Sequence, residues 1–474
     1  MSSTPQTQTA RPPSRGLLRL AAAALGMTVL GMGVGFARTN PLDLGSDLAE
    51  SPASVLPGDA VAYLELDAEP GLGQQVEALR FAAKFPGLRR RLPQGEDTDP
   101  RELLWQRLAD GRKACEGIDY GRDVEPWLGQ RAGLALRAGS EQPVVALETN
   151  QEKTGEQPQS GAAAKLAGCL TGGSGAATSQ GYLLLAADQA AADQLAQLED
   201  SASLAVAERF DADLTKVGSR GFLSWWATRD GLLQLAPDQF RDAPLVSTAG
   251  TLRLADGSPE VRTLAKLDRE IKTSQSSTAV GDFPPETALA VGLAEGSIVL
   301  DEAWPALEKL IGTPSETSDL NLPDDLRTVL GRDARIAVGP RTADGSQPWS
   351  LSSYADRTAL GDVLRRAGGS EPVTIVAGTP KVPVAATAAN TEWAQRVSGS
   401  KQQLDRGAMF KAAVAKPEQA QFALFVDLQQ FPGELREYLP DASPEDLEAL
   451  QALGLTGHVE DDNYVVAVGR LTAR

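Results

Sequence analysis

The longest apolar stretch of the chain lies near its beginning, at residues 16–38 (GLLRLAAAALGMTVLGMGVGFAR). No charged residue occurs from Leu20 to Ala37. As a helix, that run would extend roughly 27 Å, close to the ~30 Å hydrocarbon thickness of a bilayer. The pattern predicts one transmembrane helix at 16–38, preceded by a disordered cytoplasmic tail at 1–15 and followed by a linker at 39–56.

The charges beside this segment predict its orientation. Arg11, Arg15 and Arg19 come before the uncharged run, whereas the first acidic residue of the chain is Asp43. Because cytoplasmic flanks of membrane helices are rich in Lys and Arg, we expect a single-pass protein of the cell membrane. Its N-terminus would be cytoplasmic and its body extracytoplasmic.

A cleaved signal peptide is the alternative, because Gly35-Phe36-Ala37 has the small residues of a cleavage site; the body would then be secreted. The run is longer than the apolar core of an ordinary signal peptide, which favours the anchor. No cysteine follows it directly, which excludes lipoprotein processing. The Gly31-x-x-x-Gly35 spacing would let two such helices pack closely, but small residues are common in membrane helices, so the oligomeric state stays open.

Beyond residue 56, the apolar positions follow the short periods of a folded protein. Alternating or continuous apolar runs predict strands at 60–66, 143–148, 181–187 and 222–227, and another after Leu128-Gly129, which we interpret as the end of a helical turn. Helical periodicity predicts helices at 73–85, 101–109, 189–198 and 205–217, and a short one within the Gly-, Ser- and Gln-rich stretch 149–180. Residues 246–254 and 261–267 flank Asp256-Gly257, a typical hairpin turn.

The second half repeats this order at an offset of about 200 residues. DDLRTVLGRDARIAV (324–338) matches DVEPWLGQRAGLAL (123–136), with Leu330-Gly331 in place of Leu128-Gly129. Further matches fall at 288–293, 348–354, 382–388, 407–415, 422–428, 453–460 and 464–471. We therefore predict an α+β fold made by tandem duplication of an α+β unit, with mostly antiparallel sheets and helices on one face. The predicted repeats are 57–268 and 284–474.

Composition narrows the classes of partner. The chain has 474 residues, 42% of them hydrophobic, which is enough to build real cores. Its net charge is -18, and the basic N-terminal tail contributes none of the acid, so the body is more acidic still. Nucleic acid is therefore disfavoured as a partner, because binding it requires a basic face.

The two cysteines, Cys115 and Cys169, both lie in the part predicted to be extracytoplasmic. An oxidising compartment permits a disulfide between them, which would stabilise the fold by roughly 4 kcal/mol on the chain-entropy model. Two separate buried thiols are the alternative. A catalytic thiol is disfavoured, because the single histidine, His458, is distant in sequence.

Several segments resemble a known family. They are PGDAVAYLELDAEPGLGQQVEALRFAAKFPGL (57–88), DPRELL (99–104), DYGRDVEPWLGQRAGLAL (119–136) and GLTGHVEDDNYVVAVGRLTAR (454–474). In this order they resemble an uncharacterised bacterial membrane-anchored family, domain of unknown function 3352, whose members have a polar tail, one membrane segment, a linker and a body. The resemblance implies this architecture and location from about Pro57 to the end. The family has no assigned activity, ligand or catalytic residues to transfer, and the short tail and linker here would keep the body near the membrane.

Candidate catalytic groups are few. Nucleophilic triads need a base beside the nucleophile, and His458 lies in the C-terminal hairpin, where we interpret it as an exposed strand or turn residue. The Gly-Gly-Ser-Gly run at 172–175 is typical of a flexible loop rather than a hydrolase elbow. The scarcity of Cys and His disfavours zinc. We predict no catalytic residue, no cofactor and no metal ligand.

The densest acidic clusters are Glu460-Asp461-Asp462 and Asp97-x-Asp99. Neither has the spacing of a calcium loop. We interpret the first as a solvated turn and the second as the start of a helix, with Pro100 suited to its first turn. A glycosidase-like carboxylate pair is the catalytic alternative.

Two other features carry weaker signals. Trp225 and Trp226 are neighbours on a predicted strand, so their rings point to opposite faces. One is expected in the core; interior packing is also favoured for the other, with a binding face or a contact between repeats as the alternative. Arg89-Arg90-Arg91 form a local basic spot, interpreted as a helix end or an exposed turn.

Three functions follow from these patterns. The leading hypothesis is a non-enzymatic, membrane-anchored envelope module that binds or scaffolds another envelope protein. The second is a carrier that shields a lipid or other apolar ligand between sheet and helices. The third is a hydrolase that uses two carboxylates, which would need strongly perturbed pKa values.

Overall fold

A computed structural model provides the structure of the chain. It describes residues 51–474, apart from 71, 92–98, 110–111, 151–159, 242, 271–275, 302–303, 305–319, 344, 368–371, 400–402, 441 and 461–462. The predicted transmembrane helix at 16–38 lies outside the described residues and stays a prediction. Within the residues that are described, no helix is both long and apolar enough to cross a bilayer.

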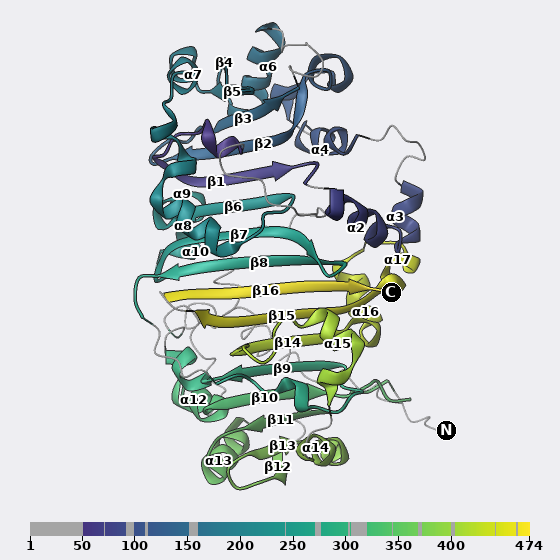
Figure 1. Cartoon of the computed structure of the whole chain (residues 1–474). Helices are drawn as coiled ribbons and strands as arrows, with labels where there is room; N and C mark the ends of the chain where they lie inside the picture. The colour runs from purple at the N-terminus through teal and green to yellow at the C-terminus, as the bar shows by residue number, and fades with distance from the viewer. Residues whose placement is uncertain are drawn as a thin grey trace, which may run out of the picture. The chain divides into compact units, whose positions relative to one another are not determined.

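The chain divides into two compact units, and each combines an antiparallel sheet with helices, so the predicted α+β class is confirmed (Figure 1). Unit 1 contains Thr273–Gly407 and Pro417–Gln430. Unit 2 contains the described residues up to Lys272 together with Ala408–Lys416 and Phe431–Arg474. This division by contacts differs from the division by sequence repeat, because the C-terminal hairpin belongs to unit 2.

In unit 2, the described strands follow the order β15-β16-β8-β7-β6-β1-β2-β3-β5-β4, and neighbouring strands are antiparallel. The strands are β1 (Ala60–Asp67), β2 (Leu128–Arg137), β3 (Val144–Thr149), β4 (Gly175–Ser179), β5 (Tyr182–Ala186), β6 (Leu223–Thr228), β7 (Leu245–Ala255), β8 (Ser258–Leu267), β15 (Leu450–Glu460) and β16 (Tyr464–Ala473).

The two hairpins predicted from sequence, β7–β8 and β15–β16, are confirmed. Asp256 and Gly257 connect β7 to β8 with φ values of 54° and 73°. Both are positive, as the tight turn of a two-residue hairpin requires, and this explains why the turn sequence was informative.

In unit 1, the described strands follow the order β12-β13-β11-β10-β9-β14. They are β9 (Leu289–Ala294), β10 (Asp333–Val338), β11 (Trp349–Ser353), β12 (Thr374–Gly378), β13 (Pro383–Ala386) and β14 (Phe422–Asp427). Its helices include α12 (Asp324–Leu330), α13 (Arg357–Ala367) and α14 (Thr391–Ser398).

The two sheets share one pattern of pairing. In unit 2, Ala62 on β1 lies opposite Leu136 on β2 and Ala227 on β6. In unit 1, Leu289 on β9 lies opposite Val338 on β10 and Val426 on β14. The order β9-β10-β11-β13-β12 therefore corresponds to β1-β2-β3-β5-β4, strand for strand.

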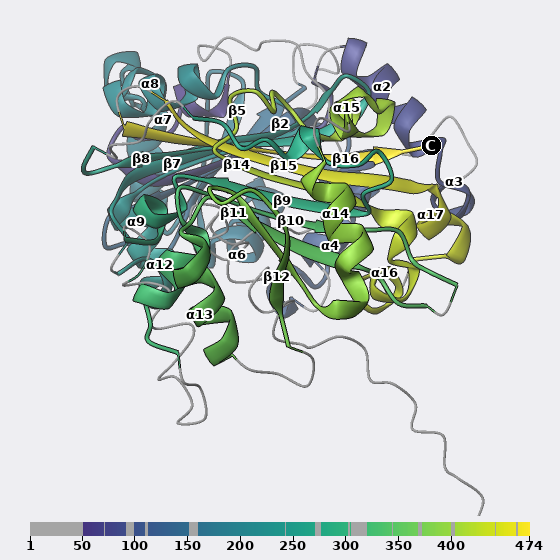
Figure 2. The same ribbon diagram turned by 90° about the horizontal axis from the view of Figure 1, so that it is seen from below.

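Helices cover both faces of the unit 2 sheet, which is more than the single covered face predicted (Figure 2). On one face, here called the α8 face, Phe210 of α8 (Glu208–Val217) packs edge-on against Tyr63 and Trp226, with ring centroids 5.2 and 5.4 Å apart. On the other, the α9 face, α9 (Arg229–Leu235) and α10 (Pro237–Phe240) pack over Ala227 and Ala265.

The other unit 2 helices are α2 (Leu72–Ala82), α3 (Pro86–Arg91), α4 (Pro100–Ala109), α6 (Ser160–Thr171), α7 (Gln189–Ala196), α15 (Ala408–Ala413), α16 (Pro432–Tyr438) and α17 (Pro444–Ala449). The pair Leu128-Gly129 opens β2 rather than ending the helical turn before it. A Cβ atom at Gly129 would lie 2.7 Å from Glu148 Cγ on β3, so the glycine serves the close approach of two strands.

Candidate functional site

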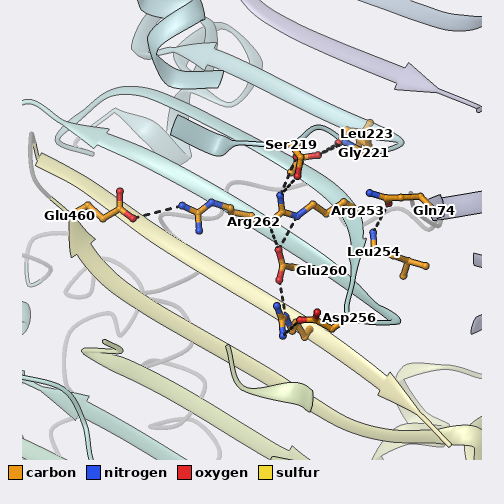
Figure 3. Close-up of polar contacts among 12 residues, drawn as sticks. Gln74, Ser219, Gly221, Leu223, Arg253, Leu254, Asp256, Glu260, Arg262 and Glu460 are labelled. Atoms are coloured by element: carbon orange, nitrogen blue, oxygen red, sulfur yellow. Dashed lines mark hydrogen bonds and ion pairs between the residues drawn. The ribbon is translucent and has the colours of Figure 1, made fainter. Parts of the chain in front are cut away.

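Charged side chains form a row across three strands on the α8 face of unit 2 (Figure 3). The register places Arg253 of β7 opposite Glu260 of β8, and Glu260 opposite Arg470 of β16. Because side chains alternate between faces, all three lie on the same side as Leu264 of the buried core. Positive, negative and positive charges therefore alternate from strand to strand.

Glu260 is the centre of this row and is only 2% exposed. Arg253 donates to Oε1 from Nη2 at 2.7 Å and from Nε at 2.9 Å, and Arg470 Nε donates to Oε2 at 2.7 Å. Burial alone would raise the pKa of Glu260, but the two guanidinium groups outweigh it and lower the pKa. Glu260 is thus a fixed anion at neutral pH and is unsuited to donate a proton.

The ends of the row are also occupied. Arg253 Nη1 donates to Ser219 Oγ at 2.6 Å, and Arg470 Nη1 lies 3.3 Å from Asp256 Oδ2 at the hairpin turn (Figure 3). The guanidinium groups of both arginines are thus bonded to acceptors within the protein. This arrangement joins β7, β8 and β16 and the segment before β6; it leaves the charges of the row matched rather than available to an anionic ligand.

His458 lies in a strand, which was one of the two interpretations, but it is not exposed, which corrects the rest of that interpretation. It is within β15 with 15% of its side chain exposed, and its Nε2 is 3.3 Å from Glu460 Oε1. Glu460 also lies 3.7 Å from Arg262 Nη2 and 3.8 Å from Lys216 Nζ. Burial is the main cause that lowers the pKa of Arg262. The histidine is partly buried, and it lies opposite Val466 of β16.

A second group of buried acids lies along β1 on the same face. Arg220 Nη1 donates to Glu65 Oε2 at 2.9 Å, and Asp67 Oδ2 lies 3.6 Å from Arg131 Nε. Burial raises the pKa of Asp67 to about 6. A raised carboxyl pKa is a property of general acids, but Asp67 also accepts the backbone N–H of Glu69 and is 8% exposed. These contacts are those of a buried structural carboxylate.

The acidic cluster predicted to start a helix is described only in part, because Asp97 lies outside the described residues. Asp99 precedes α4, and its Oδ1 accepts the backbone N–H of Arg101 at 2.9 Å. Tyr120 donates its hydroxyl to Asp99 Oδ2 at 2.6 Å. Asp99 therefore has the helix-start role that was predicted. In the other cluster, Asp461 and Asp462 are not among the described residues.

The two tryptophans point to opposite faces of β6, as alternation requires. Trp226 is 4% exposed on the α8 face and donates its indole N–H to Asp213 at 2.9 Å. Trp225 is half-buried on the α9 face. A Cβ atom at Gly250 on β7 would lie 2.1 Å from the Trp225 ring, so the ring lies directly on that glycine.

Around Trp225, the α9 face carries two cross-strand rows of apolar residues that remain partly exposed. The first row consists of three residues that face one another across neighbouring strands: Leu134, Leu64 and Trp225. The second row consists of four such residues: Leu66, Leu223, Leu252 and Val261. Leu64 is 36% exposed. We call these seven residues the apolar rows. Sequence alternation could indicate their shared face, but not that the face is incompletely covered.

An open apolar pocket of about 230 Å³ lies where α2, α17 and the ends of β15 and β16 meet. Phe81, Phe85, Leu447, Leu450 and Leu471 are among its lining residues. Small-molecule sites usually enclose about 300–1,000 Å³. This pocket therefore has room for a single apolar side chain or a short acyl segment.

Cys115 and Cys169 form a disulfide, which joins the segment after α4 to α6. Both are buried, at 5% exposure. Gly172 and Gly175 flank the turn from α6 to β4, so the Gly-Gly-Ser-Gly run connects two ordered elements. Within the described ranges, no three His, Cys, Asp or Glu side chains lie close enough together to hold a metal ion.

Comparisons with known proteins add little. No protein-family model matches the chain, and no curated protein matches it. One solved structure, titled "Structure of crystal form I of TP0453", is similar over 47% of this chain and 81% of that chain, with 10% identity and a TM-score of 0.22. That likeness carries no inference about fold or function. Membership of the uncharacterised family therefore stays a prediction.

Proposed function

We propose that this protein is a membrane-anchored, extracytoplasmic binding or scaffolding module without catalytic activity. The observation that carries the proposal is the set of apolar rows on the α9 face. Seven apolar side chains on five neighbouring strands stay partly in contact with water there, with Trp225 fixed at the centre by Gly250. Contiguous apolar surface of this kind is costly unless something covers it, and it typically marks an interaction site.

The chemistry of the buried acids supports binding over catalysis. Glu260 and Glu65 are each held by arginines, and Asp67 accepts a backbone N–H. A carboxylate hydrolase needs one acid that can donate a proton to the substrate and a second that can attack or activate water. Here the buried carboxylates are committed to contacts between strands, so the hydrolase is the least supported of the three hypotheses.

The disulfide supports the proposed location. Disulfides form and persist in oxidising compartments and are rare in the cytosol. The bridge between Cys115 and Cys169 therefore agrees with a body held outside the membrane by the segment at 16–38. Cleavage of that segment would give a secreted protein with the same body.

A tandem duplication accounts for the internal correspondence. The paired registers at Ala62 and Leu289 and the shared strand order support it, as does the sequence offset of about 200 residues. Phe210 and Phe410 are both fully buried on the helices α8 and α15, which precede the corresponding strands β6 and β14. We propose that both repeats descend from one α+β unit.

Carriage of a lipid or another apolar ligand is the second candidate, and the pocket beside Phe81 and Leu471 is the observation that favours it. Its volume of about 230 Å³ is too small to enclose a whole lipid. A larger pocket of about 600 Å³ between α13 and β12 is lined by charged side chains, among them Arg357, Asp362 and Arg365, and is less suited to an apolar ligand. Binding through an open face is therefore the better supported function.

The test is site-specific photo-crosslinking in intact cells. A photoreactive amino acid at Leu64 would sample the apolar rows, and one at Asp211, exposed on α8, would sample the opposite face. We expect one recurrent product from Leu64, a protein for the binding module or an extractable lipid for the carrier, and its loss when Trp225→Asp is added. Equal, non-specific products from both positions would contradict the proposal.

A further inference from the structure

Helix α2 is apolar on two sides. Its inner side carries Phe81, which is 4% exposed and lines the apolar pocket with Phe85. Its outer side carries Val76 and Leu79, which are 45% and 71% exposed. Since α2 already packs through Phe81, the outer apolar side chains are not needed to hold the helix in place.

The segment 72–91, which contains α2 and α3, is basic although the protein as a whole is acidic. Residues 72–91 contain one acid, Glu77, and five basic residues, whereas the whole chain carries a charge of -18. Arg80, Arg89 and Arg90 are exposed. Lys84 extends over the Phe81 ring and donates to Ala473 O at 2.7 Å, so its ammonium group fixes the segment to the end of β16.

The neighbouring helix α17 is acidic, but two of its carboxylates already contact α3. Asp446 Oδ1 accepts the backbone N–H of Gly87 at 2.7 Å, and Arg90 pairs with Glu445. Both views place α3 and α17 side by side at one end of the unit 2 strands (Figures 1 and 2). Arg80 and Arg89 lie outside these contacts and remain at the surface with Leu79.

We propose that α2 and α3 dock on the surface of an anionic lipid bilayer. Exposed apolar side chains beside Lys and Arg are the pattern of helices that lie in a membrane interface, where the apolar groups enter the headgroup region and the cations meet anionic lipids. The twelve residues 39–50 that separate the predicted membrane segment from the described body extend at most roughly 43 Å. A tethered body therefore keeps this segment within reach of the bilayer, which favours lipid over an acidic protein as the partner.

A thiol-reactive, environment-sensitive fluorophore tests this docking. Cys115 and Cys169 are joined, so a new cysteine in Leu79→Cys is labelled alone. The full chain is reconstituted into vesicles of phosphatidylcholine with or without phosphatidylglycerol. We expect a blue-shifted emission and protection from an aqueous quencher only in the anionic vesicles. Val206→Cys is the matched control, because Val206 is also an exposed apolar residue, at 57%, and its signal should not depend on lipid charge.

Charge reversal then separates docking from simple apolar adsorption. Arg80→Glu with Arg89→Glu should reduce the equilibrium constant for docking, measured from the ratio of protected to unprotected label at position 79, by at least about 25-fold in anionic vesicles, since each basic residue near such a surface contributes about fivefold. Unchanged thermal unfolding would show that the variant folds. Equal signals at positions 79 and 206, or equal signals in neutral and anionic vesicles, would overturn the proposal. Protection in cells but not in vesicles would also overturn it and indicate a protein partner.

Discussion

The hydroxyl of Tyr464 donates to Asp213 Oδ1 at 2.6 Å, which joins the last strand of the chain to helix α8. Trp226 donates its indole N–H to the other oxygen of the same carboxylate at 2.9 Å. Asp213 is 1% exposed, so β16, which is distant in sequence, meets α8 and β6 at one buried acceptor. The C-terminal hairpin is therefore part of the unit 2 core rather than an appendage to it.

Replacing Asp213 should destabilise unit 2 strongly. Asp213→Ala leaves the Tyr464 hydroxyl and the Trp226 indole as buried donors without an acceptor, at about 1–3 kcal/mol each. Tyr464→Phe removes one donor and should cost less. Urea unfolding, followed by tryptophan fluorescence, measures both. Tyr438→Phe is the matched control: at 82% exposure, loss of its hydroxyl should leave the midpoint unchanged. A larger loss for Tyr464→Phe than for Asp213→Ala would contradict this account.

Reduction of the disulfide should lower the thermal stability of unit 2. The bond joins residues 54 positions apart, and closing a loop of that length contributes about 4 kcal/mol on the chain-entropy model. We expect the unfolding temperature to fall when a reductant is added. The variant Cys115→Ala/Cys169→Ala should start at the lower temperature and show no response to reductant. An equal response of variant and parent would mean that the reductant acts elsewhere.

Glu260 and Asp256 both pair with Arg470, but only the first should matter for stability. Glu260→Gln takes the buried anion away from Arg253 and from Arg470, which keeps only the exposed Asp256 as a partner, and this should cost about 3–5 kcal/mol. Asp256 has 81% of its side chain exposed, so Asp256→Asn should cost at most about 1 kcal/mol. Chemical denaturation of the two variants makes the comparison. Similar costs would show that the row of charges does not act as a buried network.

The sequence predicted the elements whose local signals agree with their tertiary surroundings. The Asp256-Gly257 turn specifies its hairpin directly, and the repeated Leu-Gly pairs at 128–129 and 330–331 mark corresponding points in the two units. Strand β4, by contrast, lies in a Gly- and Ser-rich stretch and forms because β5 supplies its hydrogen bonds, a relation that no local pattern carries.

Neither the row of charged side chains around Glu260 nor the apolar rows could be predicted from the sequence, and the reason is the same for both. Each depends on register between strands distant in the chain: Glu260 meets Arg470 only because β16 pairs with β8. Alternation places Leu64 and Leu66 on one face, but their partial exposure depends on which helices cover that face. The interpretation of His458 as exposed was wrong for the same reason, because only 15% of its side chain is exposed once β15 pairs with β16.

The pH dependence of stability should contain a component from Asp67. Burial raises its pKa from 3.8 to about 6 in the folded protein, so between these values the folded state binds more protons than the unfolded state. Stability must then fall as the pH rises through this window, by up to about 3 kcal/mol for a shift of this size. Asp67→Asn removes the titration. We expect the variant to gain stability relative to the parent at about pH 7 and to lose that advantage near pH 4.

Equilibrium unfolding at a series of pH values measures this difference. The difference between variant and parent is the quantity that isolates Asp67, because the other titrating groups are shared and cancel. Asp211→Asn is the control, since Asp211 is exposed on α8. A difference for Asp67→Asn that stayed constant from about pH 4 to 7 would mean that Arg131, 3.6 Å away, fully offsets the burial of the carboxylate. A difference that grows with pH would show that unit 2 tolerates a buried charge that its fold would be more stable without.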